Sequence, residues 1–376
     1  MKFTIEKNLF LKLLSSVYGV ASKKNPNNLA ILQNIKMETS GNFLYLVGTD
    51  SDTYIKNCCQ VFVDRQGETT VSAQLIYDIV RKMEDGAEIC CDYANGDRTM
   101  IVKSGKSKFK LTCLSADGYP NCEDQQMQSE FKVKLKDLIN IIEKTRLSIS
   151  DDISRYYLNG LFFHTLEENG ELKLTAVSTD GHRLSAVKLD YFEGSTPIGG
   201  AIVPKKALPE IKKILSLSTQ GDVTVSLSRT KIKFEMENAM VISKLIDAEF
   251  PDYRRVIPVE NKSLLRVNKR DISSVIDRVA TITSDSHKGI KLTASDNSLV
   301  LEANSNENGS ASEEMKVDFN YSDKIEMGFN SRFFLDIFSQ IESEMVNIFF
   351  KDNTSAILIK GEEEPGNTFV LMPIRI

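Results

Sequence analysis

The chain has 376 residues, a length that allows two to four domains and a sizeable buried core. Hydrophobic residues make up 41% and charged residues 26% of it, as in soluble globular proteins rather than disordered, collagen-like or membrane proteins. The net charge of −5 would repel a polyanion unless the positive charge is gathered on one surface. No apolar run approaches the roughly 18 residues of a membrane-spanning helix, and the first residues do not resemble a signal peptide. We therefore expect a cytoplasmic protein with no membrane partner.

A short strand followed by an amphipathic helix recurs three times along the chain. The copies begin at Phe3-Thr4-Ile5, Phe131-Lys132-Val133 and Leu265-Arg266-Val267, and apolar residues follow each at helical spacing. An interval of about 130 residues is too long for a solenoid repeat and suits a whole domain. The sequence therefore predicts three similar domains in tandem, over residues 1–122, 130–253 and 254–376.

Each predicted domain contains a second strand and helix, which begin near Thr70, Ala201 and Glu326. Alternating strands separated by turn residues follow the helices, as in 223–234. Single helices between runs of strands indicate an α+β fold with antiparallel sheets rather than a doubly wound parallel sheet. The sequence therefore predicts six copies of a helix with several antiparallel strands.

Proline and polar residues gather at the two predicted domain boundaries. Residues 117–121 and 250–258 look like two versions of one linker. The chain ends in an apolar tail, 369–376, which we expect to pack rather than extend into water. Taken alone, this tail is equally well explained as an edge strand that completes a sheet.

The cysteines give no sign of a metal site. All six lie in the first third of the chain: Cys58, Cys59, Cys90, Cys91, Cys113 and Cys122. Neighbours on a strand point to opposite faces, so neither vicinal pair can easily share a metal or a disulfide, and Cys-x2-Cys spacing is absent. We expect buried reduced thiols, no metal and no cofactor.

Catalysis has one weak candidate. Of the histidines His164, His182 and His287, none belongs to a metal-binding pair. Residues 179–183 place an acid two positions before His182, but the matching segment 49–52 has no histidine. A turn after a strand explains the Asp-Gly step better. With no phosphate-binding loop and no set of acid, base and nucleophile, we expect a non-catalytic protein.

Positive charge is concentrated on the predicted helices. The second domain contributes Lys205, Lys206, Lys212 and Lys213, and the first contributes Lys23 and Lys24. For any single helix this pattern is also that of an ordinary solvated face. Its recurrence on most of six related helices favours one basic surface, which would bind phosphates without reading sequence.

Four stretches of the sequence resemble those of a known family in the same order. They are Arg155–Gly160, Thr179–Leu184, Phe250–Val256 and Met372–Arg375. On these residues the chain resembles, over essentially its whole length, the bacterial sliding clamps, the β subunits of DNA polymerase III. The resemblance implies a head-to-tail homodimer that forms a closed ring of six domains, with helices lining the hole. Such a ring would encircle double-stranded DNA and tether the polymerase as a processivity factor.

The resemblance also implies the partners and a site for them. These are the replicative polymerase catalytic subunit, the clamp loader, and other polymerases and repair proteins, which would insert a short peptide into a cleft between the second and third domains. The residues implied for it are Leu158, Thr179, Gly181, His182, Arg183, Leu184, Pro251, Arg255, Val256, His287, Asn330, Phe333, Val370, Leu371, Met372, Pro373, Ile374 and Arg375. Leu184, Val256, Val370 and Met372 would form an apolar floor. Arg183 and Arg255 would orient the peptide, and deletion from Val370 onward should abolish partner binding.

Some positions depart from the family pattern. His287 stands where an aromatic residue is familiar, Phe333 replaces a tyrosine, and Thr354 and Ala356 lie at neighbouring positions, so the peptide preference is open. We do not expect Asp152 or Gln74 to contact DNA. The resemblance also implies a dimer seam in which Phe109 and Leu111 of one subunit lie against Thr281 and Ile282 of the other. Two other classes of function stay open: a scaffold that never closes around DNA, and a DNA enzyme.

Overall fold

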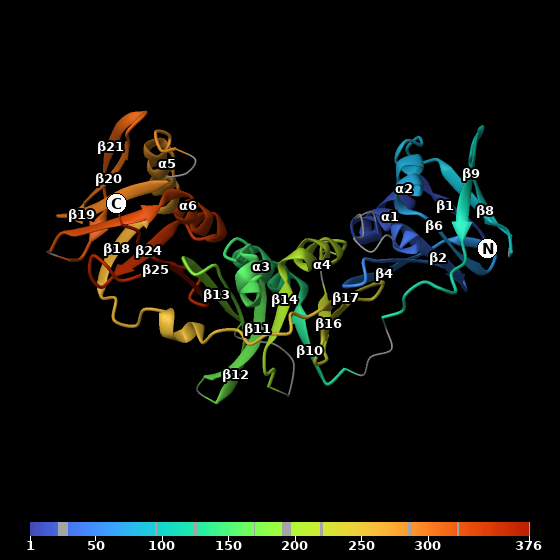
Figure 1. Cartoon of the computed structure of the whole chain (residues 1–376), viewed down its shortest axis with the longest axis horizontal. Helices are drawn as coiled ribbons and strands as arrows, with labels where there is room; N and C mark the ends of the chain where they lie inside the picture. The colour runs from blue at the N-terminus through green and yellow to red at the C-terminus, as the bar shows by residue number, and fades with distance from the viewer. Residues whose placement is uncertain are drawn as a thin grey trace. The chain divides into compact units, whose positions relative to one another are not determined.

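The chain folds into two compact units, each built from antiparallel strands and α-helices (Figure 1). The computed structural model describes residues 1–21, 29–94, 96–122, 127–168, 170–189, 197–218, 221–284, 288–321 and 323–375. The described residues of unit 1 lie in Met1–Ile139 and Lys206–Leu245, and those of unit 2 in Asn140–Phe192, Pro197–Lys205 and Ile246–Ile376. The predicted α+β class is confirmed.

Unit 1 contains one 13-stranded antiparallel sheet. Its elements are β1 (Lys2–Glu6), α1 (Lys7–Ala21), η1 (Ala30–Gln33), β2 (Asn34–Ser40), β3 (Phe43–Thr49), β4 (Thr53–Gln60), β5 (Phe62–Arg65), β6 (Gly67–Ser72), α2 (Ala73–Arg81), β7 (Glu88–Tyr93), β8 (Thr99–Ser104), β9 (Ser107–Leu114), β10 (Ser129–Lys134), α4 (Leu208–Leu215), β15 (Asp222–Leu227), β16 (Lys231–Glu235) and β17 (Ala239–Lys244). The strand order is β10-β15-β16-β17-β4-β3-β2-β6-β9-β8-β7-β1-β5. Two segments cross the boundary between the units along the chain: α3 (Leu135–Arg146) and η3 (Lys205–Ala207).

Unit 2 contains a nine-stranded and a four-stranded sheet. Its elements are η2 (Ile153–Leu158), β11 (Gly160–Glu168), β12 (Glu171–Thr179), β13 (Arg183–Leu189), β14 (Ala201–Pro204), η4 (Tyr253–Val256), β18 (Ser263–Asn268), α5 (Lys269–Ala280), β19 (Gly289–Ser295), β20 (Ser298–Ser305), β21 (Gly309–Lys316), β22 (Asp318–Phe319), β23 (Ile325–Asn330), α6 (Ser331–Gln340), β24 (Met345–Phe350), β25 (Ile357–Gly361) and β26 (Asn367–Leu371). The orders are β14-β11-β12-β13-β26-β25-β24-β18-β22 and β21-β20-β19-β23.

All six predicted strand-and-helix copies are present, and local chemistry explains where the helices begin. Asn268 caps α5 by accepting hydrogen bonds from the Arg270 and Asp271 amides at 2.9 and 3.3 Å. Asn330 caps α6 in the same way, and Ser72 caps α2. These side chains satisfy amides that the first helical turn leaves without a partner.

The helices bury the apolar faces that their sequence periodicity predicts. In α1, Phe10 and Leu14 are fully buried, and burial of such a side chain stabilises the fold by about 1.5–3 kcal/mol. Tyr18 of α1 stacks on Tyr77 of α2 at 4.3 Å between ring centroids, and the two helices lie together against the sheet (Figure 1). In unit 2 the rings of Phe334 and Phe338 on α6 lie 5.2 Å apart in the core.

The C-terminal strand differs from one prediction. β26 lies between β13 and β25, so the interpretation of the tail as an edge strand is wrong. Its residues Phe369 and Leu371 are fully buried, because strands cover both sides of it. In the described part of the chain, no helix has the length and apolar character needed to cross a bilayer.

Candidate functional site

A tight turn between β12 and β13 forms the centre of the candidate site. The Thr179 hydroxyl donates to the Arg183 carbonyl at 2.7 Å and accepts from the Gly181 amide at 3.1 Å. Asp180 accepts from the amides of His182 and Arg183 at 2.9 and 3.0 Å. These bonds confirm that the Asp-Gly step is a turn. Gly181 has a φ of 89°, where residues other than glycine are strained.

Arg183 ties this turn to the third domain. Its side chain is buried, and its guanidinium donates to Asp180 at 3.0 Å, to Asp336 of α6 at 2.6 Å and to the Leu147 carbonyl. Its Cζ also lies 4.4 Å from the centre of the Phe333 ring. Every guanidinium nitrogen therefore has a partner inside unit 2, so the geometry gives Arg183 a positioning role at this turn, and its contact with a bound peptide stays a prediction.

The tail residues cross the surface beside this turn. The Met372 amide donates to the His182 carbonyl and the Ile374 amide to the Gly328 carbonyl, both at 2.8 Å. The backbone is thus fixed on both sides, while the side chains of Met372 and Ile374 stay 41% and 38% exposed. Pro373 is half-buried and Arg375 is exposed.

The predicted apolar floor exists at two levels. Leu158, Leu184 and Val370 belong to one buried cluster with Tyr253 of the linker. Val256, by contrast, is 52% exposed at the end of η4, like the side chain of Met372. Exposed apolar side chains thus follow directly along the chain from residues of a buried cluster, a combination typical of a docking surface rather than of a plain core.

The remaining predicted residues frame this surface. Pro251 and Arg255 are exposed, and Arg255 donates to Asp252 at 3.2 Å. Leu371 is buried next to Val370, and Phe333 lies parallel to the His182 ring at 6.1 Å. His287 lies outside the described residues. A deletion from Val370 would remove two buried residues of an internal strand, and is therefore no clean test of binding.

The two other departures from the family pattern lie near the same cluster. Thr354 donates from both its amide and its hydroxyl to Asp352, and these bonds with those of Ser355 lower the pKa of Asp352 to about 2. Ala356 packs against the buried cluster. Thr354 is therefore bound locally, while Ala356 fills the floor.

Comparison with known proteins identifies the family. Models of the N-terminal, central and C-terminal domains of the DNA polymerase III β subunit match residues 1–123, 132–252 and 254–375. The chain belongs to the sliding clamp family. It is 37% identical over 376 residues to the β sliding clamp of Caulobacter vibrioides and 32% identical over 377 residues to that of Escherichia coli K12, with each chain covered fully.

Solved sliding clamps share the fold. A clamp from Bartonella birtlesii bound to griselimycin matches with a TM-score of 0.95 at 37% identity, with full coverage of both chains. A Caulobacter crescentus clamp with PEG bound to a putative β-motif tethering region also has a TM-score of 0.95, at 37% identity, covering 100% of this chain and 99% of that one. The protein is thus built from three tandem clamp domains, and it is a non-catalytic processivity factor of DNA polymerase III.

The lysines predicted to face DNA in this clamp are partly neutralised. Lys205 lies 2.7 Å from Asp151, and Lys206 pairs with Asp52, which also lies 3.1 Å from Lys244. Burial alone would raise the pKa of Asp52, but the two lysines lower it. Lys212 and Lys213 are half-buried on α4, and Lys23 and Lys24 lie outside the described residues.

Asp152 and Gln74 make local contacts. Asp152 accepts from Ser154 and Arg155, which lowers its pKa to about 2. Gln74 accepts from Tyr18 at 2.5 Å and donates to Asp78. Both side chains therefore form hydrogen bonds to neighbouring residues of the same chain.

The residues predicted at the dimer seam lie on or beside two sheet edges. Phe109 of β9 is 36% exposed, whereas Leu111 is buried. In the described strands, residues 107–112 of β9 pair with β8 on one side only. Thr281 ends α5, and half-buried Ile282 packs against the core that α5 shares with β21, the edge strand of the four-stranded sheet.

Unit 2 contains a second ionic cluster that no sequence pattern indicates. Lys144 is buried and donates to Glu364, whose carboxylate also accepts from the Ser343 amide at 2.8 Å and from Asn367 at 2.6 Å. Burial alone would raise the pKa of Glu364, but Lys144 and the other donors lower it. In the sequence of α3, Lys144 resembles an ordinary surface lysine of an amphipathic helix. Only its burial in the structure distinguishes it.

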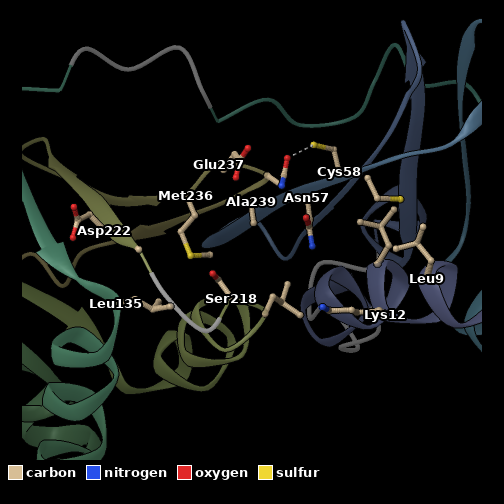
Figure 2. Close-up of a pocket in the computed structure, with 15 residues that line it drawn as sticks. Leu9, Lys12, Asn57, Cys58, Leu135, Ser218, Asp222, Met236, Glu237 and Ala239 are labelled. Atoms are coloured by element: carbon tan, nitrogen blue, oxygen red, sulfur yellow. Dashed lines mark hydrogen bonds between the residues drawn. The ribbon is translucent and has the colours of Figure 1, made fainter.

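Unit 1 contains a cavity of about 360 Å³ (Figure 2). Leu9 and Lys12 of α1, Cys58 of β4, and Ser218 and Met236 line it. Burial raises the pKa of the Cys58 thiol, which makes it a poor nucleophile. Cys91 and Cys113 are buried and the other four cysteines are half-buried, so the prediction of buried thiols is wrong for those four. In the described part of the chain, no cluster of His, Cys, Asp or Glu could hold a metal.

Proposed function

We propose that two copies of this chain join head to tail into a ring around duplex DNA, and that the surface around Met372 and Ile374 binds peptides of its protein partners. The partners would be the polymerase catalytic subunit, the clamp loader, and other polymerases and repair proteins. The observation that carries this proposal is the pair of exposed apolar tail residues, whose backbone amides are hydrogen-bonded to His182 and Gly328 and which follow Val370 of the buried cluster along the chain.

The open edges of β9 and β21 support the head-to-tail arrangement. Exposed Lys108 and Lys110 lie on β9, and exposed Glu314 lies on β21 beside Glu313, whose carboxylate is paired with Arg278. An unpaired edge of one sign favours pairing with an edge of the opposite sign and disfavours pairing with itself. Phe109 would then be covered on assembly, as its exposure in the single chain suggests.

Retention on circular and linear plasmid tests the ring. After loading, the protein should stay on the circle during gel filtration at moderate salt and leave the linear form, because encirclement holds only where no end is free. The variant Lys108→Glu/Lys110→Glu should be monomeric by light scattering and be lost from both forms. Equal retention of the natural chain on both forms would favour a scaffold that never closes around DNA.

Substitutions at the tail test the peptide site. Met372→Ser with Ile374→Ser should weaken binding of a C-terminal polymerase peptide at least tenfold, because both apolar contacts are lost. Val259→Ser is the matched control, since Val259 is 90% exposed and outside the predicted site. Equal affinity of the tail variant and the control would refute this assignment.

A further inference from the structure

Two buried aromatic residues hold the linker between the second and third domains on unit 2. Phe250 and Tyr253 are 7% and 6% exposed, while Pro251, Arg255 and Val256 between and after them are exposed. These exposed residues belong to the proposed peptide site. Their position therefore depends on how the two buried rings are seated.

Both rings rest on one face of β11. Phe250 stacks on Phe162 at 4.6 Å with 2° between the ring planes, and Phe162 stacks on His164 at 4.8 Å. Phe162 and His164 are two residues apart, and so they point to the same face of the strand. Tyr253 meets His164 edge to face at 5.6 Å. His164 therefore contacts Tyr253 directly and Phe250 through Phe162.

A hydrogen bond defines the state of this histidine. His164 Nε2 lies 2.9 Å from the Tyr253 hydroxyl, and Nδ1 lies 3.3 Å from the Thr165 carbonyl. Because a carbonyl only accepts, this network assigns the hydrogen to Nδ1 and leaves Nε2 to accept from the tyrosine. A second proton on the ring would remove the Nε2 acceptor, so that the tyrosine hydroxyl would have to turn and accept from Nε2–H beside a buried charged ring, which costs free energy.

The surroundings favour the neutral ring. Burial lowers the pKa of His164, the Thr165 carbonyl opposes this, and Arg254 and Lys188 lower it further. Burial raises the pKa of Tyr253 to about 12, with Arg254 lowering it and Glu168 and Asp252 raising it. At neutral pH the pair therefore consists of a neutral imidazole and a protonated hydroxyl.

We propose that His164 and Tyr253 are a positioning pair that seats the linker and sets the affinity of the peptide site, so that acidification weakens peptide binding. The inference rests on the proposed peptide site. The seated linker is fully favoured above the ordinary histidine pKa near 6.5. As the pH falls below that value, the unseated form takes up the proton more readily, and the seated form loses its advantage.

Unit 1 supplies a matched control. Tyr119 lies in the corresponding first linker and is also buried, but its hydroxyl donates to the carbonyls of Asn34 and Val47 at 3.0 and 3.1 Å. Carbonyls do not titrate in this range. Tyr119→Phe thus removes an equally buried hydroxyl without touching a titratable partner.

Binding of the same C-terminal polymerase peptide to the immobilised full chain tests the pair, at pH 7.5 and pH 5.5, with thermal unfolding followed in parallel. His164→Phe keeps the stacking but removes the acceptor and the proton site. At pH 7.5, His164→Phe and Tyr253→Phe should each weaken binding about three- to tenfold, as expected for one lost buried hydrogen bond, and Tyr119→Phe should bind as the natural chain does. From pH 7.5 to 5.5 the natural chain should lose at least threefold more affinity than His164→Phe. His182 is present in both, so this difference isolates His164.

Three results would overturn the inference. In the first, His164→Phe and Tyr253→Phe bind the polymerase peptide as the natural chain does at both pH values. In the second, they unfold at lower temperature with unchanged affinity, which would make the pair a merely structural contact. In the third, the natural chain itself does not bind, which would overturn the proposed site as well; in the first two, that site stands.

Discussion

The turn at 49–53 in unit 1 and the turn at 179–183 in unit 2 are two copies of one backbone with different side chains. In both, the threonine hydroxyl donates to the carbonyl four residues on, at 2.8 and 2.7 Å. In both, the aspartate accepts two amides. A further backbone hydrogen bond is shared. The Lys244 amide donates to the Asp52 backbone carbonyl, and the Met372 amide donates to the His182 backbone carbonyl, both at 2.8 Å.

The side chains give the two copies different uses. In unit 1, Asp52 and Lys244 form an ion pair with Lys206 nearby, and Thr53 stands where unit 2 has Arg183. In unit 2, His182 and Met372 present a ring and an apolar chain to solvent. The difference teaches that backbone hydrogen bonds preserve the repeat, while a few side chains on it decide whether a junction is a charged surface or an apolar docking surface.

The other end of each junction also differs. The hairpin before β26 carries Glu364, which closes around buried Lys144. The hairpin before β17 carries Met236, which lines a cavity instead. One junction is thus filled by an ionic cluster, and the other leaves space.

The largest expected effect is at Arg183. Arg183→Ala should lower the free energy of unfolding by about 3 kcal/mol, because it leaves Asp180 and Asp336 without their buried cation. The matching change Thr53→Ala should cost about 1 kcal/mol, a typical value for a point substitution. Urea unfolding followed by circular dichroism measures both. Similar losses for the two variants would show that the guanidinium does not bind the turn to α6 more strongly than ordinary packing does.

Removing the buried lysine should have a smaller effect. Lys144→Met should cost about 2 kcal/mol at pH 7, since Glu364 loses its cation but keeps its other donors. Because the pKa of Glu364 is lowered in the folded chain, its stabilisation is present above the ordinary value near 4.3 and is lost as the pH falls through the folded value. The loss of stability on acidification should therefore be shallower in Lys144→Met. Parallel pH profiles of the two proteins would contradict this.

Filling the cavity in unit 1 should stabilise it. Ala239→Val adds two methyl groups beside the cavity on a strand, where a β-branched side chain fits well, and should raise the free energy of unfolding by about 0.5–1 kcal/mol. The urea midpoint measures the gain. A lower midpoint would mean that the surrounding side chains cannot accommodate the added groups.

The smallest effect on stability is expected at Asp52. Asp52→Asn should change the free energy of unfolding by less than about 1 kcal/mol, because its ion pairs are partly exposed. It should release Lys206 and Lys244 for phosphate, and so steepen the dependence of DNA affinity on salt by about one unit in a log–log plot. An unchanged slope would place neither lysine against DNA.

Much of the fold could be predicted from the sequence because the repeats appear in the periodic spacing of its apolar residues. Phe10, Leu13 and Leu14 alone are enough to predict which face of α1 is buried. Long-range pairing was harder: that the tail becomes an internal strand depends on β13, almost 190 residues earlier in the chain. The direction of the Arg183 side chain depends on Asp336 in another domain. No local sequence pattern around either residue predicts that contact.

Pairing between the edges of β9 and β21 does not by itself decide whether a head-to-tail assembly closes into a ring. Two different but complementary edges join copies head to tail. Such an assembly closes into a ring only when the rotation from one copy to the next completes a full circle. A small change in that rotation would leave every contact intact and yield an open filament that lengthens with concentration. Faults in assembly of this protein should therefore be sought in long polymers as well as in monomers.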